Sequence, residues 1–229
     1  ADIKFINGED KMYELYQDST HLYRPKYNGT SFTFGMLHRY SQIFQYGISI
    51  DLPYSLDVSD KYTYSNQIDP DESFSDTWYY TVKKPVNFHM GGALFFKTIN
   101  LFYEFEFVDW TNLKFSSSSI YNGDIPASIG INNEIRENLR STTSHHFGFA
   151  FHVPKFPIHL YAGYQNLPTP FQGQYSNNAR QSYSFGFSFM VHQNFSLQGG
   201  YNKYSWEYNG QPENYEKFTF GVALHTFNF

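Results

Sequence analysis

The chain has 229 residues, a formal net charge of −5 and no cysteine, which excludes a disulfide scaffold and argues against nucleic-acid binding by bulk electrostatics. Aromatic residues make up 21% of the chain, including 25 Phe and 21 Tyr, more than a soluble core of this size would readily bury. No apolar run approaches the roughly 18 residues of a transmembrane helix. A membrane-spanning chain would therefore cross as strands; a secreted aromatic-rich β-sandwich or a carbohydrate-binding module is the alternative.

Residues 1–29 lack the alternation of a strand. Met12 and Leu15 lie at roughly helical spacing in a polar stretch that ends before Pro25, a residue that helices rarely accept in their interior. We expect residues 1–29 to form an extracellular loop with a short helix, or else a disordered terminus. The strand region then covers residues 30–229.

The segment from Phe44 to Val58 alternates between apolar and polar or small residues. Its apolar positions are Phe44, Tyr46, Ile48, Ile50, Leu52, Tyr54, Leu56 and Val58. Period-two alternation predicts a strand with one apolar face. This run of about 15 residues exceeds the 5–6 residues typical of a soluble strand.

Similar alternation predicts about nine strands, joined by connections that alternate between short turns and longer polar loops. Bacterial barrels place short turns in the periplasm and longer loops outside. The sequence therefore predicts an all-β fold, an antiparallel transmembrane β-barrel of the bacterial outer membrane. The predicted strands are 30–39, 43–64, 78–97, 100–116, 136–153, 156–167, 181–192, 195–206 and 215–229, and the longer loops are 65–77, 117–135, 168–180 and 207–214.

With this orientation the last strand runs inward and the C-terminal Phe229 is periplasmic. Its alternation changes phase near His225, which requires a bulge or a change of face. The strand at 30–39 also runs inward, and an odd count cannot close as an even-numbered barrel. Either the chain is the C-terminal part of a longer barrel, or residues 1–29 hold another strand and complete a small barrel of about 8 or 10 strands.

Two carboxylates, Glu104 and Glu106, alternate with apolar residues in the strand at 100–116. A charge facing lipid costs several kcal/mol near the midplane, so both side chains are predicted to face the lumen. One interpretation is a polar patch in a transport pathway. We favour the other, a network that fills the interior with Lys83, Lys84 or Arg180 as partners.

Three histidines, His89, His152 and His159, fall on the same small or polar faces. We expect each of them to pack in the interior and not to bind a metal. His145-His146 lies at a strand start, with no cysteine and no motif spacing for zinc. Our candidate substrate-binding or lumen-facing residues are His89, Glu104, Glu106, Trp110, His152 and His159.

Proline interrupts the strand at 78–97. Because proline lacks the backbone donor of a sheet ladder, we expect this strand to start or bend at Pro85. No Gly-x-Ser-x-Gly, P-loop or His-Glu-x-x-His motif is present. Ser144 beside His145 is no catalytic arrangement without an orienting third group. We expect no enzyme activity, no cofactor and no metal.

Several segments resemble one known family. They are Phe34-Gly-Met-Leu-His-Arg-Tyr40, Gln45-Tyr-Gly-Ile-Ser-Ile50, Lys84-Pro-Val-Asn-Phe-His-Met-Gly-Gly-Ala-Leu-Phe-Phe96, Leu101-Phe-Tyr-Glu-Phe-Glu-Phe-Val-Asp-Trp110, His159-Leu-Tyr-Ala-Gly-Tyr164 with Pro168 and Pro170 in the following loop, and the C-terminal strand with Phe229. In this order over residues 30–229, they resemble the long-chain fatty acid and hydrocarbon transporters of the FadL/TodX type. The pair Asp109-Trp110 is the most specific piece.

The resemblance implies a barrel of about 14 strands with an N-terminal plug, of which this chain matches only the C-terminal portion. It implies passive outer-membrane uptake of hydrophobic small molecules such as long-chain fatty acids or hydrocarbons, without a cofactor. Expected partners are membrane lipids, lipopolysaccharide and a hydrophobic ligand, with no nucleic acid, and the protein is expected to be a monomer. The alternative function is a structural or secretion-associated barrel that serves as an anchor or docking platform without transport.

Overall fold

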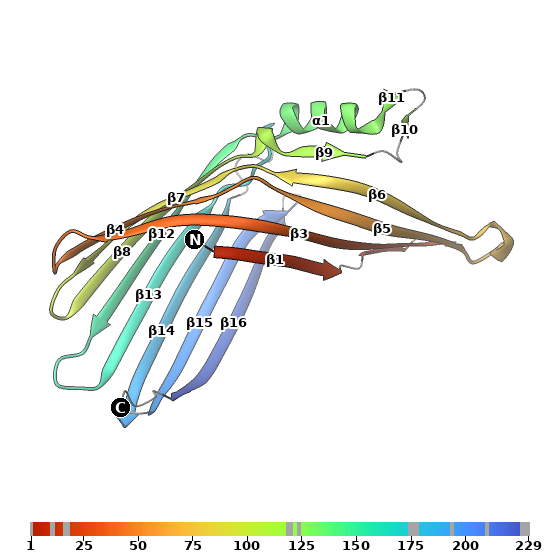
Figure 1. Ribbon diagram of the computed structural model, residues 1–229. Helices are drawn as coiled ribbons and strands as arrows, with labels where there is room; N and C mark the ends of the chain where they lie inside the picture. Colours follow the sequence, from red (N-terminus) through yellow and green to blue (C-terminus); the bar gives the residue numbers. More distant parts are fainter. Residues whose placement is uncertain are drawn as a thin grey trace. The chain divides into compact units, whose positions relative to one another are not determined.

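Strands dominate the computed structural model of the chain (Figure 1). The residues that it describes are 2–9, 12–15, 19–117, 121–122, 125–173, 179–192, 195–208 and 211–224. The predicted change of face near His225 and the terminal Phe229 therefore lie outside the described residues. Among the described residues, 14 strands form one sheet in the order β16-β15-β14-β13-β12-β8-β7-β4-β3-β5-β6-β9, with β1 and β2 also paired to β3. The all-β prediction is confirmed.

The chain divides into two compact units. Unit 1 comprises Ala1–Phe34, Ile50–Asn87 and Asp109–Arg140, and unit 2 comprises Gly35–Ser49, Phe88–Val108 and Ser141–Phe229.

The sheet of unit 1 is built around one long strand, β3 (Ser19–Arg39). On one side β3 pairs antiparallel with β1 (Asp2–Glu9) and β2 (Met12–Leu15). On its other side it pairs with β5 (Tyr54–Asn66), which pairs in turn with β6 (Phe74–Lys84). The short β9 (Lys114–Ser116) completes this order beside β6.

The prediction that residues 1–29 contain no strand is wrong. The register from Asp2 opposite Thr33 to Glu9 opposite Lys26 shows that β1 is held by a strand distant in the sequence. Pairing of this kind is a tertiary interaction that a local hydrophobic pattern does not record.

A helix begins within the predicted loop 117–135 and extends beyond it. Helix α1 (Ala127–Asn138) follows the small strands β10 (Tyr121–Asn122) and β11 (Ile125–Pro126). The Asn132 side-chain amide donates to the Phe115 carbonyl, and its oxygen accepts from the Phe115 amide, both at 2.7 Å. This two-point contact fixes α1 to β9.

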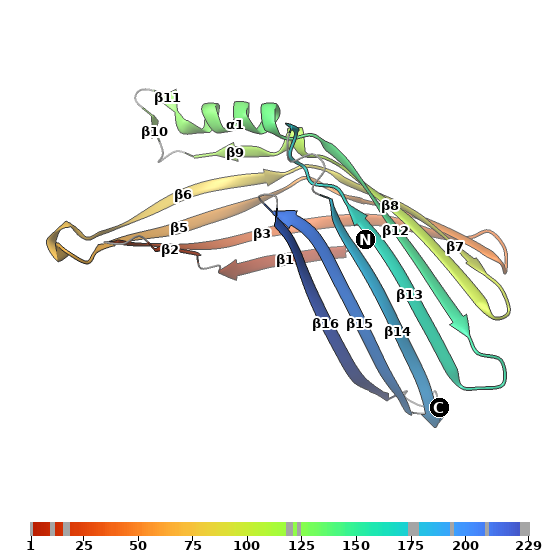
Figure 2. The same cartoon turned by 180° about the vertical axis from the view of Figure 1, so that it is seen from behind.

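Unit 2 is a sheet of antiparallel strands in the order β16-β15-β14-β13-β12-β8-β7-β4. It contains β4 (Phe44–Asp51), β7 (Asn87–Phe95), β8 (Ile99–Asp109), β12 (Ser141–His152), β13 (Ile158–Leu167), β14 (Arg180–His192), β15 (Phe195–Tyr208) and β16 (Gln211–Leu224). From β12 to β16 each strand pairs with the next one along the chain, as Figure 2 shows. The predicted long loop 207–214 is wrong, because β15 extends to Tyr208 and β16 begins at Gln211.

Three of the nine predicted strands are each divided in two. The strand at 43–64 breaks at Leu52 and Pro53, between β4 and β5. The strand at 78–97 breaks at Pro85, as predicted, between β6 and β7. The predicted strand 100–116 is divided by the short 3₁₀-helix η2 (Trp110–Asn112). A second 3₁₀-helix, η1 (Pro70–Glu72), lies between β5 and β6. Strands β1 and β2 both pair with β3, and together they form one further segment beside the nine predicted ones. Ten segments would be an even number, as in bacterial barrels.

The strands of unit 2 have two chemically different faces, because successive side chains of a strand point to opposite sides. We call the first the apolar face; its residues include Leu101, Tyr103, Phe147, Phe149, Ala162, Tyr164, Tyr183, Phe185, Phe187, Phe218, Phe220 and Val222. The second is the polar face; its residues include His89, Glu104, Glu106, His146, Gly148, His152, His159, Gln165, Ser184 and Thr219.

Hydrophobic burial within the described residues is small. Only Val58, Val108 and Leu139 are buried apolar side chains there, while Phe185 is 58% exposed and Phe220 is 77% exposed. The apolar side chains are therefore presented outward, on the apolar face, rather than packed into an internal core. No helix in the described part of the chain is long and apolar enough to cross a membrane.

Candidate functional site

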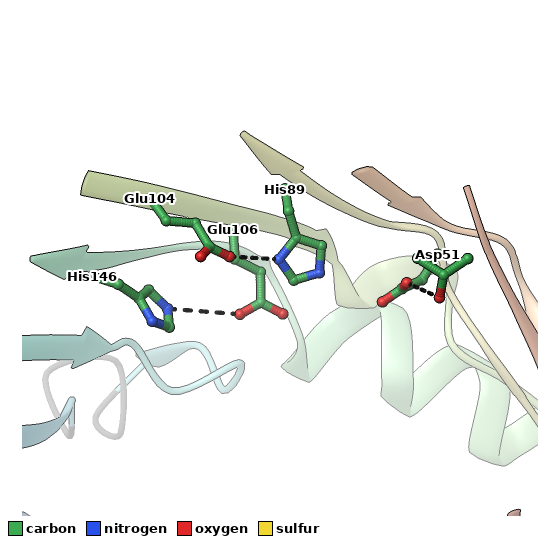
Figure 3. Close-up of polar contacts among 6 residues, drawn as sticks. Asp51, His89, Glu104, Glu106 and His146 are labelled. Carbon is green, nitrogen blue, oxygen red and sulfur yellow. Dashed lines mark hydrogen bonds and ion pairs between the residues drawn. The ribbon is translucent and has the colours of Figure 1, made fainter. Parts of the chain in front are cut away.

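The polar face of unit 2 carries two imidazole–carboxylate pairs, which come from β7, β8 and β12 (Figure 3). His89 lies on β7, Glu104 and Glu106 lie on β8, and His146 lies on β12. Strand β8 is the neighbour of both β7 and β12 in the sheet. Because Glu104 and Glu106 are two residues apart, strand geometry sends both carboxylates to the same face.

The closer pair joins His89 to Glu104. The Nδ1 atom of His89 lies 3.1 Å from Oε1 of Glu104, and the two side chains are 25% and 49% exposed. When the imidazole Nδ1 carries a proton it donates to the carboxylate. The contact becomes a charge-assisted hydrogen bond when the ring is cationic.

The second pair is longer and less exposed. Nε2 of His146 lies 4.0 Å from Oε2 of Glu106, with side-chain exposures of 26% and 24%. This separation is that of an ion pair rather than a hydrogen bond.

The contacts differ in kind from the predicted network. Glu104 and Glu106 each contact a histidine, whereas Lys84 and Arg180 have aromatic neighbours. Lys84 Nζ lies 5.0 Å from the centre of the Trp110 ring, in unit 1. Arg180 lies over the rings of Tyr204 and Trp206, at 4.5 and 5.5 Å.

Trp110 lies in a turn of unit 1. The side chain of Asp109 accepts hydrogen bonds from the Thr111 amide at 3.2 Å and the Thr111 hydroxyl at 2.7 Å. It also accepts one from the Asn112 side chain at 2.7 Å. The Asp109-Trp110 pair thus forms and caps the η2 turn.

The remaining two candidates, His152 and His159, meet across the β12–β13 pair. They are directly opposite in register, with Nδ1 of His152 3.2 Å from Nε2 of His159. The His159 ring is also stacked on Tyr161, with centroids 6.4 Å apart and planes 11° apart.

A hollow of about 990 Å³ lies in unit 2 and is lined by residues of β3, β4, β7, β8, β12, β13 and β14. Its lining includes His89, Glu104, His146 and His159. Among the described residues that line it, Glu104 is the one carboxylate, and there is no lysine or arginine. Aromatic and aliphatic residues lie between these polar groups, so the hollow offers both apolar surface and hydrogen-bonding side chains.

Small residues make room for this hollow. A side chain added at Gly148 would bring its Cβ to 3.2 Å from Cβ of Phe102, which covers that glycine. Phe102 lies on the polar face because it is two residues before Glu104 in β8. Its ring meets Phe95 edge to face, with centroids 6.1 Å apart.

A second hollow of about 700 Å³ is almost entirely apolar. Its lining includes Phe44, Leu94, Leu101, Tyr103, Phe147 and Phe185, interrupted by small residues such as Gly92 and Ala162. These are residues of the apolar face, so this hollow is a recess in the surface that carries the exposed aromatic side chains.

Five of the six candidate residues, His89, Glu104, Glu106, His152 and His159, lie on the polar face, whereas Trp110 lies in the η2 turn, and sequence reasoning did not select His146. The alternation could have indicated His146, because it lies six residues before His152 in the same strand and so faces the same side. Within the described residues, no group of three or more His, Asp or Glu side chains is placed to hold a metal ion.

Hairpin-connected antiparallel strands with one polar and one exposed apolar face define the fold of an outer-membrane β-barrel. A similar solved structure is the CymD monoaromatic hydrocarbon channel, with a TM-score of 0.54 and 8% sequence identity. The alignment covers 97% of this chain and 78% of the CymD chain. No protein-family model and no curated protein sequence matches the chain. At this identity the likeness shows a shared fold.

Proposed function

We propose that the protein is an outer-membrane channel for the passive uptake of hydrophobic small molecules. The observation that carries this proposal is the exposed apolar face of unit 2. A soluble monomer rarely exposes a contiguous apolar patch above a few hundred Å². The rows of Phe, Tyr, Leu and Val on this face, of which Phe218, Phe220 and Leu224 are 66%, 77% and 79% exposed, suit a lipid environment.

The hollow beside the polar face is the proposed ligand site. Ligand pockets are mostly apolar with a few placed polar groups, and typical volumes are about 300–1,000 Å³. Burial of ligand surface would supply about 25 cal/mol per Å², and the two imidazole–carboxylate pairs would add hydrogen-bonding groups along the path. The CymD likeness supports a channel over an enzyme at the level of fold.

The lining charges favour uncharged ligands over fatty-acid anions. A carboxylate head group in the hollow would meet Glu104, and the described lining offers no lysine or arginine to pair with it. Burial of an unpaired anion is costly. Of the two ligand classes that the FadL/TodX resemblance implies, neutral hydrocarbons fit this lining better. The remaining expectations, membership of that family, contact with lipopolysaccharide, a monomeric state and a periplasmic C-terminus, belong to the same proposal.

Uptake into vesicles tests the proposal. The purified chain, reconstituted in phospholipid vesicles, should speed the entry of a neutral monoaromatic hydrocarbon above protein-free vesicles, with saturation. Oleate should enter more slowly. Glu104→Gln should raise oleate entry relative to the hydrocarbon, whereas Glu213→Gln, an exposed position on β16, should not change that ratio.

Equal rates with and without the protein would contradict the channel proposal and favour the anchoring or docking barrel. Fast oleate entry that is insensitive to Glu104→Gln would contradict the ligand preference alone and leave the channel proposal supported.

A further inference from the structure

The His152–His159 contact lies on the polar face, where His159 also lines the hollow that contains His89, Glu104 and His146. The two rings come from strands joined by one tight connection, and their centroids are 4.5 Å apart with planes inclined by 55°. His152 is exposed and His159 is half-buried. Both rings are therefore open to an ion arriving from solution.

The backbone fixes this pair. The Val153 amide donates to the Ile158 carbonyl at 3.0 Å, and the Phe156 amide donates to the Val153 carbonyl at 3.2 Å. Lys155 takes a positive φ of 69° in the turn. The register then continues without a shift to His145 opposite Asn166, and Tyr161 supports the His159 ring by stacking. The two imidazoles are thus brought together by strand pairing rather than by chance approach of long side chains.

The distance between the facing nitrogens suits a shared metal ion. A tetrahedral ion with Zn–N bonds of about 2.0–2.1 Å holds two imidazole nitrogens about 3.3–3.4 Å apart. With the same bond lengths, adjacent positions of a square-planar ion are about 2.9 Å apart. The observed 3.2 Å between Nδ1 of His152 and Nε2 of His159 lies between these values. Each ring can turn a lone pair to the ion while its other nitrogen carries the proton.

We propose that His152 and His159 form a two-imidazole site for a late first-row divalent ion, with water completing the coordination. Imidazole suits Zn²⁺, Cu²⁺ and Ni²⁺, and affinity rises toward Cu²⁺. The ion links β12 to β13 beside their turn. This departs from the sequence-based expectation that these histidines pack without a metal, and it holds whether or not the protein transports a ligand.

Copper binding to the folded full-length chain in detergent tests the site. Cu²⁺ titration followed by electron paramagnetic resonance should show one site with two imidazole nitrogens. His152→Gln and His159→Gln should each lose the two-nitrogen signal and weaken Cu²⁺ binding at least tenfold. The control His38→Gln removes a histidine whose ring meets Tyr46 instead and should leave the signal unchanged. If His152→Gln and His159→Gln each bind Cu²⁺ with the affinity of the wild-type chain, the proposed site is overturned.

A measurement on the wild-type chain guards against misfolded variants. Zn²⁺ should protect His152 and His159, and not His38, from modification by diethyl pyrocarbonate, as read by peptide mass spectrometry. Equal modification of all three histidines with and without Zn²⁺ would also overturn the proposal.

Discussion

Nδ1 of His89 lies 3.1 Å from Oε1 of Glu104, across the neighbouring strands β7 and β8. Since the Glu104 side chain is 49% exposed, solvent screens the pair, and its coupling should resemble that of a surface ion pair. We expect a coupling energy of about 0.5 kcal/mol in a double-mutant cycle of His89→Gln and Glu104→Gln. Urea unfolding of the detergent-folded protein measures it.

A control cycle pairs His89→Gln with Glu216→Gln. Glu216 lies on β16, far from β7 in the strand order, so the effects of these two changes should be additive, with a smaller coupling energy than in the first cycle. Equal coupling in the two cycles would contradict a direct His89–Glu104 interaction.

A new charge on β16 should have different effects on the apolar face and on the polar face. Phe220→Arg places a cation on the apolar face, where lipid would cost it about 2–4 kcal/mol at the midplane of a bilayer. Thr219→Arg places the same side chain on the polar face, at the adjacent position. Folding into phospholipid vesicles under urea should therefore be impaired by Phe220→Arg and changed little by Thr219→Arg. Equal penalties would show that the faces are assigned wrongly.

Gly148 is required by the ring that covers it. Because an added Cβ would lie 3.2 Å from Cβ of Phe102, Gly148→Val should destabilise the protein by about 1–3 kcal/mol through overpacking. Gly221→Val is the matched change, since the position of its added Cβ has no heavy atom within 4 Å. Thermal unfolding of both variants decides the point, and similar melting temperatures would refute the packing argument.

The contact of α1 with β9 depends on one amide. Asn132→Ala removes both 2.7 Å hydrogen bonds to Phe115. We expect this to destabilise the local contact between α1 and β9 by about 1–2 kcal/mol. Hydrogen exchange at the Phe115 amide should become faster, whereas Asn133→Ala, at an exposed position of the same helix, should leave it unchanged. Unchanged exchange in Asn132→Ala would mean that other contacts hold the helix.

The faces of the strands were predictable because the side-chain period of a strand is set by the backbone and needs no knowledge of its neighbours. For this reason Glu104, Glu106 and His89 were correctly placed on one face. Their partners were not predictable in the same way. The His146–Glu106 pair depends on β8 lying beside β12, although residues 110–140 separate these strands in the sequence.

The missed strands have a related cause. The residues of β1 show no alternation that distinguishes them, yet the open edge of β3 supplies backbone partners from Lys26 to Thr33. Pro85 marks a break that the sequence predicted, because proline removes a ladder hydrogen bond whatever surrounds it. The break at Pro53 was missed, because the alternation from Phe44 to Val58 runs through it.

The uninterrupted meander from β12 to β16 also bears on how such a wall grows. Every strand there pairs with the one that precedes it in the chain, so each new hairpin finds its template already formed at the free edge. Backbone groups can then be satisfied progressively as the chain enters lipid, where unpaired ones are costly. Duplication or loss of one hairpin would therefore widen or narrow this sheet by two strands without rerouting any other strand.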